Sequence, residues 1–250
     1  INMNNNKDKN IIFKKNIINE INNVGENKSK FEEIKINEYK NRINLIYYAK
    51  SKGNYNLFGK NFFENNKDNI ELIINNKPNI LITNCDLNEG ENNITIIIKN
   101  KLNNLSGMFS GCKSLKDITE LKYLDVKENK DFSHMFYGCS SLSDINSLQN
   151  WNVSNGSNFS YMFCGCSSLS DISPLQNWNT SNSNDFSYIF CGCSSLSDIR
   201  PLQNWNVSKV NTFYRMFCRC STLSEINALQ NWNVSNCTNF SYMFQSCSSL

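Results

Sequence analysis

The decapeptide FCGCSSLSDI occurs twice in the chain, at residues 163–172 and again at residues 190–199. The two copies begin 27 residues apart, and a fixed spacing of this length indicates a protein built from internal repeats. The same spacing runs through the second half of the chain as columns of identical residues. The columns are Phe109, Phe136, Phe163, Phe190, Phe217 and Phe244; Cys112, Cys139, Cys166, Cys193, Cys220 and Cys247; Leu115, Leu142, Leu169, Leu196, Leu223 and Leu250; and Trp151, Trp178, Trp205 and Trp232.

Each repeat contains two patterns of apolar residues. Starting at Phe159, apolar residues stand at i, i+3, i+4 and i+7, which is typical of one helix face, so we expect a short helix over about residues 155–165. The stretch LSDISPL at residues 169–175 predicts a short strand with its Leu and Ile inward. Neither element buries both faces alone. The sequence therefore predicts an α/β leucine-rich-repeat solenoid, with one short strand and one short helix per 27-residue unit, strands concave and helices convex.

The repeat also resembles a known family. MFYGCSSLSDINSLQNWNVSN at residues 135–155 and its copies resemble the BspA-type leucine-rich repeat, also described as a mycoplasma-type lipoprotein repeat. The resemblance covers about residues 108–250 through the signature MF-x-x-C-x-x-L-x-x-I followed by NW-N-x-S. It implies a binding or adhesion protein without catalysis, located at the cell surface or outside the cell.

Composition divides the chain into three parts. Residues 1–40 are polar and charged and predict a flexible lead-in, while residues 41–100 hold short alternating apolar runs and predict a small β-domain that caps the solenoid. Within this domain, NIELIINN at residues 69–76 and the apolar run after it predict a hairpin. Residues 101–250 are expected to form about five to six units of the solenoid. We expect a fragment, truncated at its C-terminus, because the chain begins with Ile1 and stops within a unit.

Several classes of function are disfavoured. The net charge is +3, without the basic excess of a nucleic-acid-binding protein. No run approaches the roughly 18 apolar residues of a membrane-spanning helix, so no span is expected in this fragment. Phosphate-binding, dinucleotide-binding and hydrolase motifs are absent from the sequence. We therefore predict a protein that is not an enzyme and has no catalytic residues and no cofactor.

The chain has eleven cysteines, some of them in Cys-x-Cys pairs. On a helix, Cys166 would lie on the buried face while Cys164 would point away from it. Helices lie roughly 10 Å apart, beyond the Cα separation of about 7 Å that a disulfide allows, so bridges between units are disfavoured. We favour structural thiols over a metal site, because the single histidine stands in a column with other side chains. That column is His134, Tyr161, Tyr188, Arg215 and Tyr242.

One acidic residue precedes the inward Ile of each repeat, and we expect it on the concave face. Stacked at roughly 4.8 Å, these carboxylates would repel one another unless something offsets the repulsion. Either they form an acidic stripe for a basic partner or a cation, or each accepts backbone amides or faces water, which we favour. The candidate binding face comprises these acids and their outward neighbours: Asp117, Asp144, Asp171, Asp198, Glu225, Asn146, Ser173, Arg200 and Asn227.

The sequence thus predicts a non-catalytic leucine-rich-repeat protein that binds a protein or glycan ligand. Cell-surface adhesion or interaction with a host or matrix is the expected role, from the family resemblance. An intracellular scaffold and a cysteine-based metal-binding module are the alternatives. Neither nucleic acid nor a metal is an expected partner.

Overall fold

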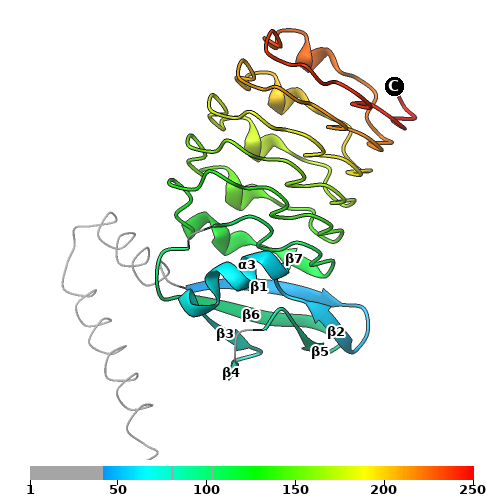
Figure 1. Ribbon diagram of the computed structural model, residues 1–250. Helices are drawn as coiled ribbons and strands as arrows, with labels where there is room; N and C mark the ends of the chain where they lie inside the picture. The colour runs from blue at the N-terminus through cyan, green and yellow to red at the C-terminus, as the bar shows by residue number, and fades with distance from the viewer. Residues whose placement is uncertain (1–41, 80–81, 103) are drawn as a thin grey trace, which may run out of the picture. The chain divides into compact units, whose positions relative to one another are not determined.

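The computed structural model describes residues 42–79, 82–102 and 104–250 and is shown in Figure 1. Lys40–Leu250 form one compact unit, and the predicted lead-in over residues 1–40 lies outside the described residues. A five-stranded sheet has the order β4-β3-β6-β1-β7, and a two-stranded sheet pairs β2 with β5. The strands are β1 (Arg42–Ala49), β2 (Gly53–Asn56), β3 (Ile70–Ile74), β4 (Lys77–Asn79), β5 (Asn84–Leu87), β6 (Gly90–Ile98) and β7 (Leu115–Asp117).

The larger sheet follows from alternation in β1, whose sequence RINLIYYA buries every second residue. Ile43, Leu45 and Tyr47 are almost fully buried, and the Tyr47 hydroxyl donates a hydrogen bond of 2.7 Å to the Leu57 carbonyl. A β-strand of period two places such residues on one face, where they form the core of this region. A hairpin forms after β3, which pairs antiparallel with β4, but its second strand is Lys77–Asn79 and so begins before the apolar run that was predicted to form it.

The segment predicted to be a helix in each repeat is instead a series of four-residue turns. The Met162 N–H donates to the Phe159 carbonyl at 3.2 Å, and the Cys166 N–H donates to the Phe163 carbonyl at 3.0 Å. The third residue of each turn is left-handed, as a type II turn requires, with φ of 60° at Tyr161 and 78° at Gly165. An α-helix cannot continue through residues of positive φ, so the turns replace it.

Alternate N–H groups of these turns bind the following repeat. The Phe163 N–H donates to the Ile189 carbonyl at 2.9 Å, and the Gly165 N–H donates to the Cys191 carbonyl at 2.7 Å. Within the described turn segments, these bonds run one way, from the N–H groups of one unit to the carbonyls of the next. One residue before each turn segment, isolated parallel bridges such as Asp131 to Asn158 also join adjacent units. Figure 1 shows successive repeats side by side.

The predicted α/β leucine-rich-repeat solenoid, with a strand and a helix in every unit, is wrong. Among the described residues, α3 (Lys60–Asn66) is the only α-helix and precedes the repeats, and β7 is the only strand within them. Leu169 and Ile172 are both buried although they are three residues apart, which a strand of period two does not allow. Because the described repeats contain no α-helix, the prediction of a concave strand side and a convex helix side loses its basis.

A short 3-10 helix follows the LSDI segment in each repeat, where a strand was expected to continue. In η4 and η5, a proline occupies the first turn, where its missing N–H costs no hydrogen bond. These helices, together with one that follows α3, are η1 (Lys67–Asn69), η2 (Thr119–Tyr123), η3 (Asn146–Leu148), η4 (Ser173–Leu175), η5 (Arg200–Leu202) and η6 (Asn227–Leu229).

The interior of the repeats is formed by the columns seen in the sequence. Phe163 is fully buried and stacks between Phe136 and Phe190, with ring centroids 5.5 Å and 5.8 Å away. Trp178 is also buried, and its indole N–H donates to the Leu148 carbonyl of the preceding repeat at 3.0 Å. Each unit therefore completes its core only against its neighbours.

The sheet region contacts the first repeat directly. Strand β7 belongs to that repeat and pairs antiparallel with β1. The Gly59 N–H donates to the Met108 carbonyl at 3.1 Å, and the Asn66 side-chain amide donates to the Asn104 carbonyl at 3.0 Å. These two donors lie at either end of α3 and satisfy carbonyls of the first repeat.

Candidate functional site

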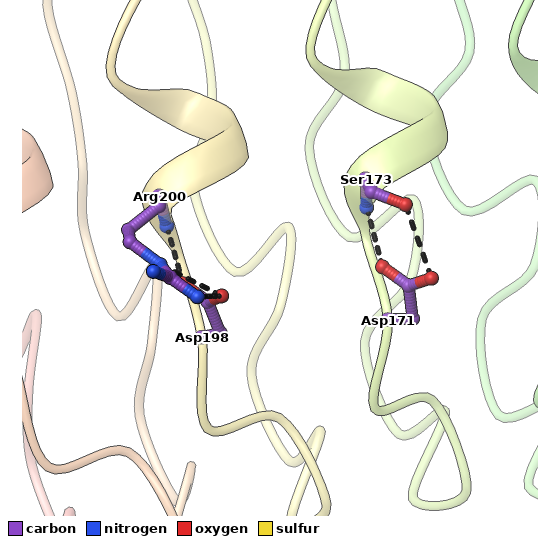
Figure 2. Close-up of polar contacts among 4 residues, drawn as sticks. All are labelled: Asp171, Ser173, Asp198 and Arg200. Carbon is purple, nitrogen blue, oxygen red and sulfur yellow. Dashed lines mark hydrogen bonds and ion pairs between the residues drawn. The ribbon is translucent and has the colours of Figure 1, made fainter.

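The aspartates of the predicted binding face bind the backbone of their own repeat. One Asp171 oxygen accepts the Ser173 N–H at 2.7 Å and the other accepts the Ser173 hydroxyl at 3.0 Å (Figure 2). Asp198 accepts the Arg200 N–H at 2.8 Å in the same way. Each bond closes a turn of the kind that aspartate favours and leads into a 3-10 helix. The equivalent bonds join Asp117 to the Thr119 N–H at 2.7 Å and Asp144 to the Asn146 N–H at 2.8 Å.

Asp198 and Arg200 also form an ion pair through their side chains. The Arg200 guanidinium approaches the carboxylate to 2.6 Å and, by hydrogen bonding, lowers the pKa of Asp198. The side chain of Arg200 is 81% exposed, so the pair is screened by water and contributes little stability. This repeat therefore presents an Asp–Arg ion pair where the preceding one presents an aspartate hydrogen-bonded to a serine (Figure 2).

Glu225 departs from the aspartate pattern. It is exposed and, among the residues that the structure describes, makes no hydrogen bond like those of the aspartates. A pocket of about 370 Å³ is lined by Asp198, Arg200, Glu225 and Asn227 together with their neighbours. The structure thus brings four of the predicted site residues together. Asp117, Asp144, Asn146, Asp171 and Ser173 occupy equivalent positions in earlier repeats, and their role in binding stays a prediction.

A second row of side chains lies on the surface of the turn segments. We call it the tyrosine row: His134, Tyr161, Tyr188, Arg215 and Tyr242. Tyr161 is sandwiched between His134 and Tyr188, with ring centroids 4.5 Å and 4.1 Å away and planes within 14° of parallel. The row continues through the guanidinium of Arg215, whose central carbon lies 5.8 Å from the centre of the Tyr188 ring and 4.9 Å from that of Tyr242.

Every member of the tyrosine row has a left-handed backbone. Their φ angles lie between 56° and 60°, a region that is costly for bulky residues and natural for glycine. Gly107 occupies the same position in the first repeat, with φ of 66°. The sequence shows that these residues recur at one position of the repeat. It does not show their backbone conformation, because the spacing of apolar residues carries no information on the sign of φ.

His134 has the environment of a stacked surface residue. It is half-buried, and this burial lowers the pKa of its imidazole. It stacks on Tyr161, lies 5.7 Å from the Tyr137 ring, and has Asp131 near enough to oppose part of this fall in pKa. The histidine therefore lies in the tyrosine row, stacked on the next member.

Nine of the eleven cysteines lie in two rows with different surroundings. The inner row is buried and comprises Cys112, Cys139, Cys166, Cys193, Cys220 and Cys247. From Cys139 onward its thiols donate to carbonyls of the preceding repeat, as Cys166 does to Phe136 at 3.1 Å. Burial raises the pKa of the Cys166 thiol to about 12. Cys164 and Cys191 lie nearer the surface and are half-buried. In the described part of the chain, no group of three or more Cys, His, Asp or Glu has metal-binding geometry.

The fold and these surfaces define a class of protein: a chain of 27-residue sequence repeats that carries rows of equivalent side chains. The chain belongs to the family described as "Mycoplasma protein of unknown function, DUF285", whose model matches residues 83–195 and 167–250. This confirms the mycoplasma-type part of the resemblance. No curated protein and no solved structure matched the chain. None of the described helices has the length and apolar character needed to cross a bilayer.

Proposed function

We propose that this protein is a non-catalytic binding module that holds a protein partner at the cell surface through the tyrosine row. One observation carries the proposal: each of five successive repeats places a large side chain at a position where the backbone is left-handed. Such a residue costs of order 1–3 kcal/mol and is retained where the surroundings or a function require it. Gly107 at the equivalent position marks the residue that the backbone itself would favour.

The geometry of the row favours a protein over a glycan. Both faces of Tyr161 are covered by other rings, and one face of Tyr188 is covered by Tyr161. A sugar ring binds an aromatic residue through an open face, whereas here mainly ring edges and Arg215 remain available. Tyrosine and arginine are the residues that contribute most at protein interfaces. Arg215 and the exposed Arg219 suit a partner with acidic or carbonyl groups.

Surface location rests on resemblance. The repeat resembles those of BspA-type surface proteins, and the chain belongs to a mycoplasma-type family. Adhesion to a host or matrix protein is the role that this resemblance supports. An intracellular scaffold would use the same surface with a different partner.

The test is binding of the immobilised full chain to a panel of matrix proteins and to a glycan array. A double variant, Tyr161→Asn with Tyr188→Asn, removes two rings while asparagine still tolerates the left-handed backbone. We expect affinity for the protein ligand to fall at least about tenfold, as for other interface hot spots. Tyr48→Asn is the matched control, since Tyr48 is exposed on β1 and outside the row.

Three results would reject parts of the proposal. Unchanged protein binding by the double variant would show that the tyrosine row is not the binding surface. Binding to glycans alone would make the partner class wrong. If protease treatment of intact cells left the protein uncut while lysed cells lost it, the surface location would be wrong.

A further inference from the structure

Three cysteines form a row beside the tyrosine row, and the first two of them are half-buried while the third is buried. Cys164, Cys191 and Cys218 occupy the same position in three successive repeats, and we call them the outer thiol row. Each follows a member of the tyrosine row by three residues and closes a turn with it. The Cys164 N–H donates to the Tyr161 carbonyl at 3.1 Å, and the Cys191 N–H donates to the Tyr188 carbonyl at 3.0 Å.

The backbones that carry these thiols are directly hydrogen-bonded. The Gly165 N–H, one residue after Cys164, donates to the Cys191 carbonyl at 2.7 Å. Chains joined by such bonds lie about 4.7–4.9 Å apart, within the Cα separation of about 4.4–6.8 Å found in disulfides. The sequence-based argument against bridges between repeats assumed helices roughly 10 Å apart, whereas the structure has hydrogen-bonded turns there and leaves all the cysteines as free thiols.

Side chains in this column reach those of the next repeat. The Cys218 thiol lies 3.8 Å from the side-chain oxygen of Gln245, its counterpart one repeat on. Hydrogen bonding with the Cys164 thiol is the main cause that raises the pKa of Cys191. Equivalent side chains of adjacent repeats therefore lie next to one another.

We propose that Cys164 and Cys191 are a modification site, at which a small-molecule disulfide such as oxidised glutathione drives formation of a reversible disulfide between adjacent repeats. The Cys164 thiolate attacks one sulfur of the small disulfide, forms a mixed disulfide and releases one glutathione thiolate. Cys191, after loss of its proton to solvent, attacks the Cys164 sulfur of that mixed disulfide and releases the second. Two protein thiols are oxidised, one small disulfide is reduced, and the two released thiolates take up the two protons.

Accessibility selects this pair from the other cysteines. Cys164 and Cys191 are half-buried, whereas Cys218 is only 2% exposed and is engaged with Gln245. The inner row is buried and donates its thiols to carbonyls of the preceding repeat. Cys85 and Cys237 have no counterpart in an adjacent repeat.

The experiment treats the reduced full chain with oxidised glutathione, blocks the remaining thiols with iodoacetamide and analyses intact mass and peptides. We expect two fewer alkylated thiols than in the reduced protein and a peptide pair cross-linked between Cys164 and Cys191. Dithiothreitol should restore both thiols. Cys164→Ser and Cys191→Ser should each abolish the cross-link, whereas Cys85→Ser should leave it unchanged.

Circular dichroism of every variant separates a lost cross-link from a lost fold. A bridge between Cys191 and Cys218, a bridge between two chains, or stable glutathione adducts without a bridge would overturn the assignment. The same treatment in concentrated urea provides the reference, and the native cross-link should exceed it at least about tenfold, since folding holds the two thiols together. Equal yields in both conditions would also overturn it. Because the readout is a covalent bond, its failure leaves the proposed binding function untouched.

Discussion

At the scale of single residues, the carboxylate of Asp171 shows how a surface charge can have a structural role. It accepts both the N–H and the hydroxyl of Ser173. We expect Asp171→Ala to lower the free energy of unfolding by about 1 kcal/mol, the usual value for a lost turn or cap hydrogen bond. Asp171→Asn should cost less, because its amide oxygen still accepts the N–H. Urea denaturation of the three proteins measures the difference.

Glu225 provides the control for that prediction. It stands in the same column without the hydrogen bonds of the aspartates in the described structure, so Glu225→Ala should change stability by less than about 0.5 kcal/mol. Equal losses in Asp171→Ala and Glu225→Ala would show that the turn hydrogen bonds add nothing.

Phe163 and Cys164 are neighbours with opposite surroundings. Phe163→Ala removes a fully buried ring from the middle of the continuous Phe stack and should cost roughly 3–5 kcal/mol. Cys164→Ser leaves the core intact in the reduced protein, so its melting curve should match that of the parent chain. Thermal melts followed by circular dichroism compare the two, and the opposite ranking would contradict the burial described here.

Burial was the part of each residue's environment that the sequence predicted well. The Phe, Leu and Trp columns are inside as expected except at the last repeat, where Leu250 is exposed and Trp232 and Phe244 are partly buried. Burying apolar surface away from water is favourable, so the apolar columns of a repeat form its core. The backbone of Tyr161 could not be predicted, since a positive φ at tyrosine contradicts its intrinsic preference. The turn bonds of the aspartates were one of two interpretations that the sequence left open.

At the scale of elements, the same spacing of apolar residues is compatible with two local structures, a helix and a series of turns. Positions i, i+3, i+4 and i+7 form one face of a helix, and here they are the first and last residues of successive four-residue turns. Gly165 is the third residue of one such turn, with φ of 78°, and a helix cannot pass through it. The hydrogen bonds that decide between the two structures join residues 26 apart, so no local pattern reveals them.

Gly59 joins the sheet region to the first repeat and gives a prediction for that junction. A Cβ at this position would collide with the Gly107 carbonyl oxygen, which belongs to rigid backbone. We expect Gly59→Ala to destabilise the protein by about 1–3 kcal/mol, as overpacking does. Gly53→Ala is the matched control, because its Cβ would meet only Tyr55 at an ordinary 3.8 Å. Chemical denaturation with equal effects in both variants would exclude a tight junction.

At the scale of the whole molecule, the buried thiols predict alkaline sensitivity. Burial raises the pKa of Cys112 and Cys166 from 9.0 to about 12. Above pH 9 the unfolded chain releases these protons while the folded chain keeps them, so stability should be constant below that pH and fall above it. The expected slope is up to about 1.4 kcal/mol per pH unit for each thiol.

Urea denaturation at several pH values between neutrality and pH 10 measures this slope. Cys166→Ala removes one of the two groups and should give a shallower fall above pH 9.0 than the parent chain. An identical slope in both proteins would mean that other groups cause the alkaline loss.

The bonds between repeats have a consequence for how such a chain can change over generations. Each turn segment donates to the next and accepts from the last with one fixed geometry, so neighbouring repeats are interchangeable. The coding DNA for FCGCSSLSDI at 163–172 and 190–199 invites unequal recombination, which would remove or add 27 residues in frame. The shortened product would join Met162 to Phe190 and restore the same donors opposite the same acceptors. Length can then vary by whole repeats while the fold persists, and natural selection can adjust how many side chains each surface row presents.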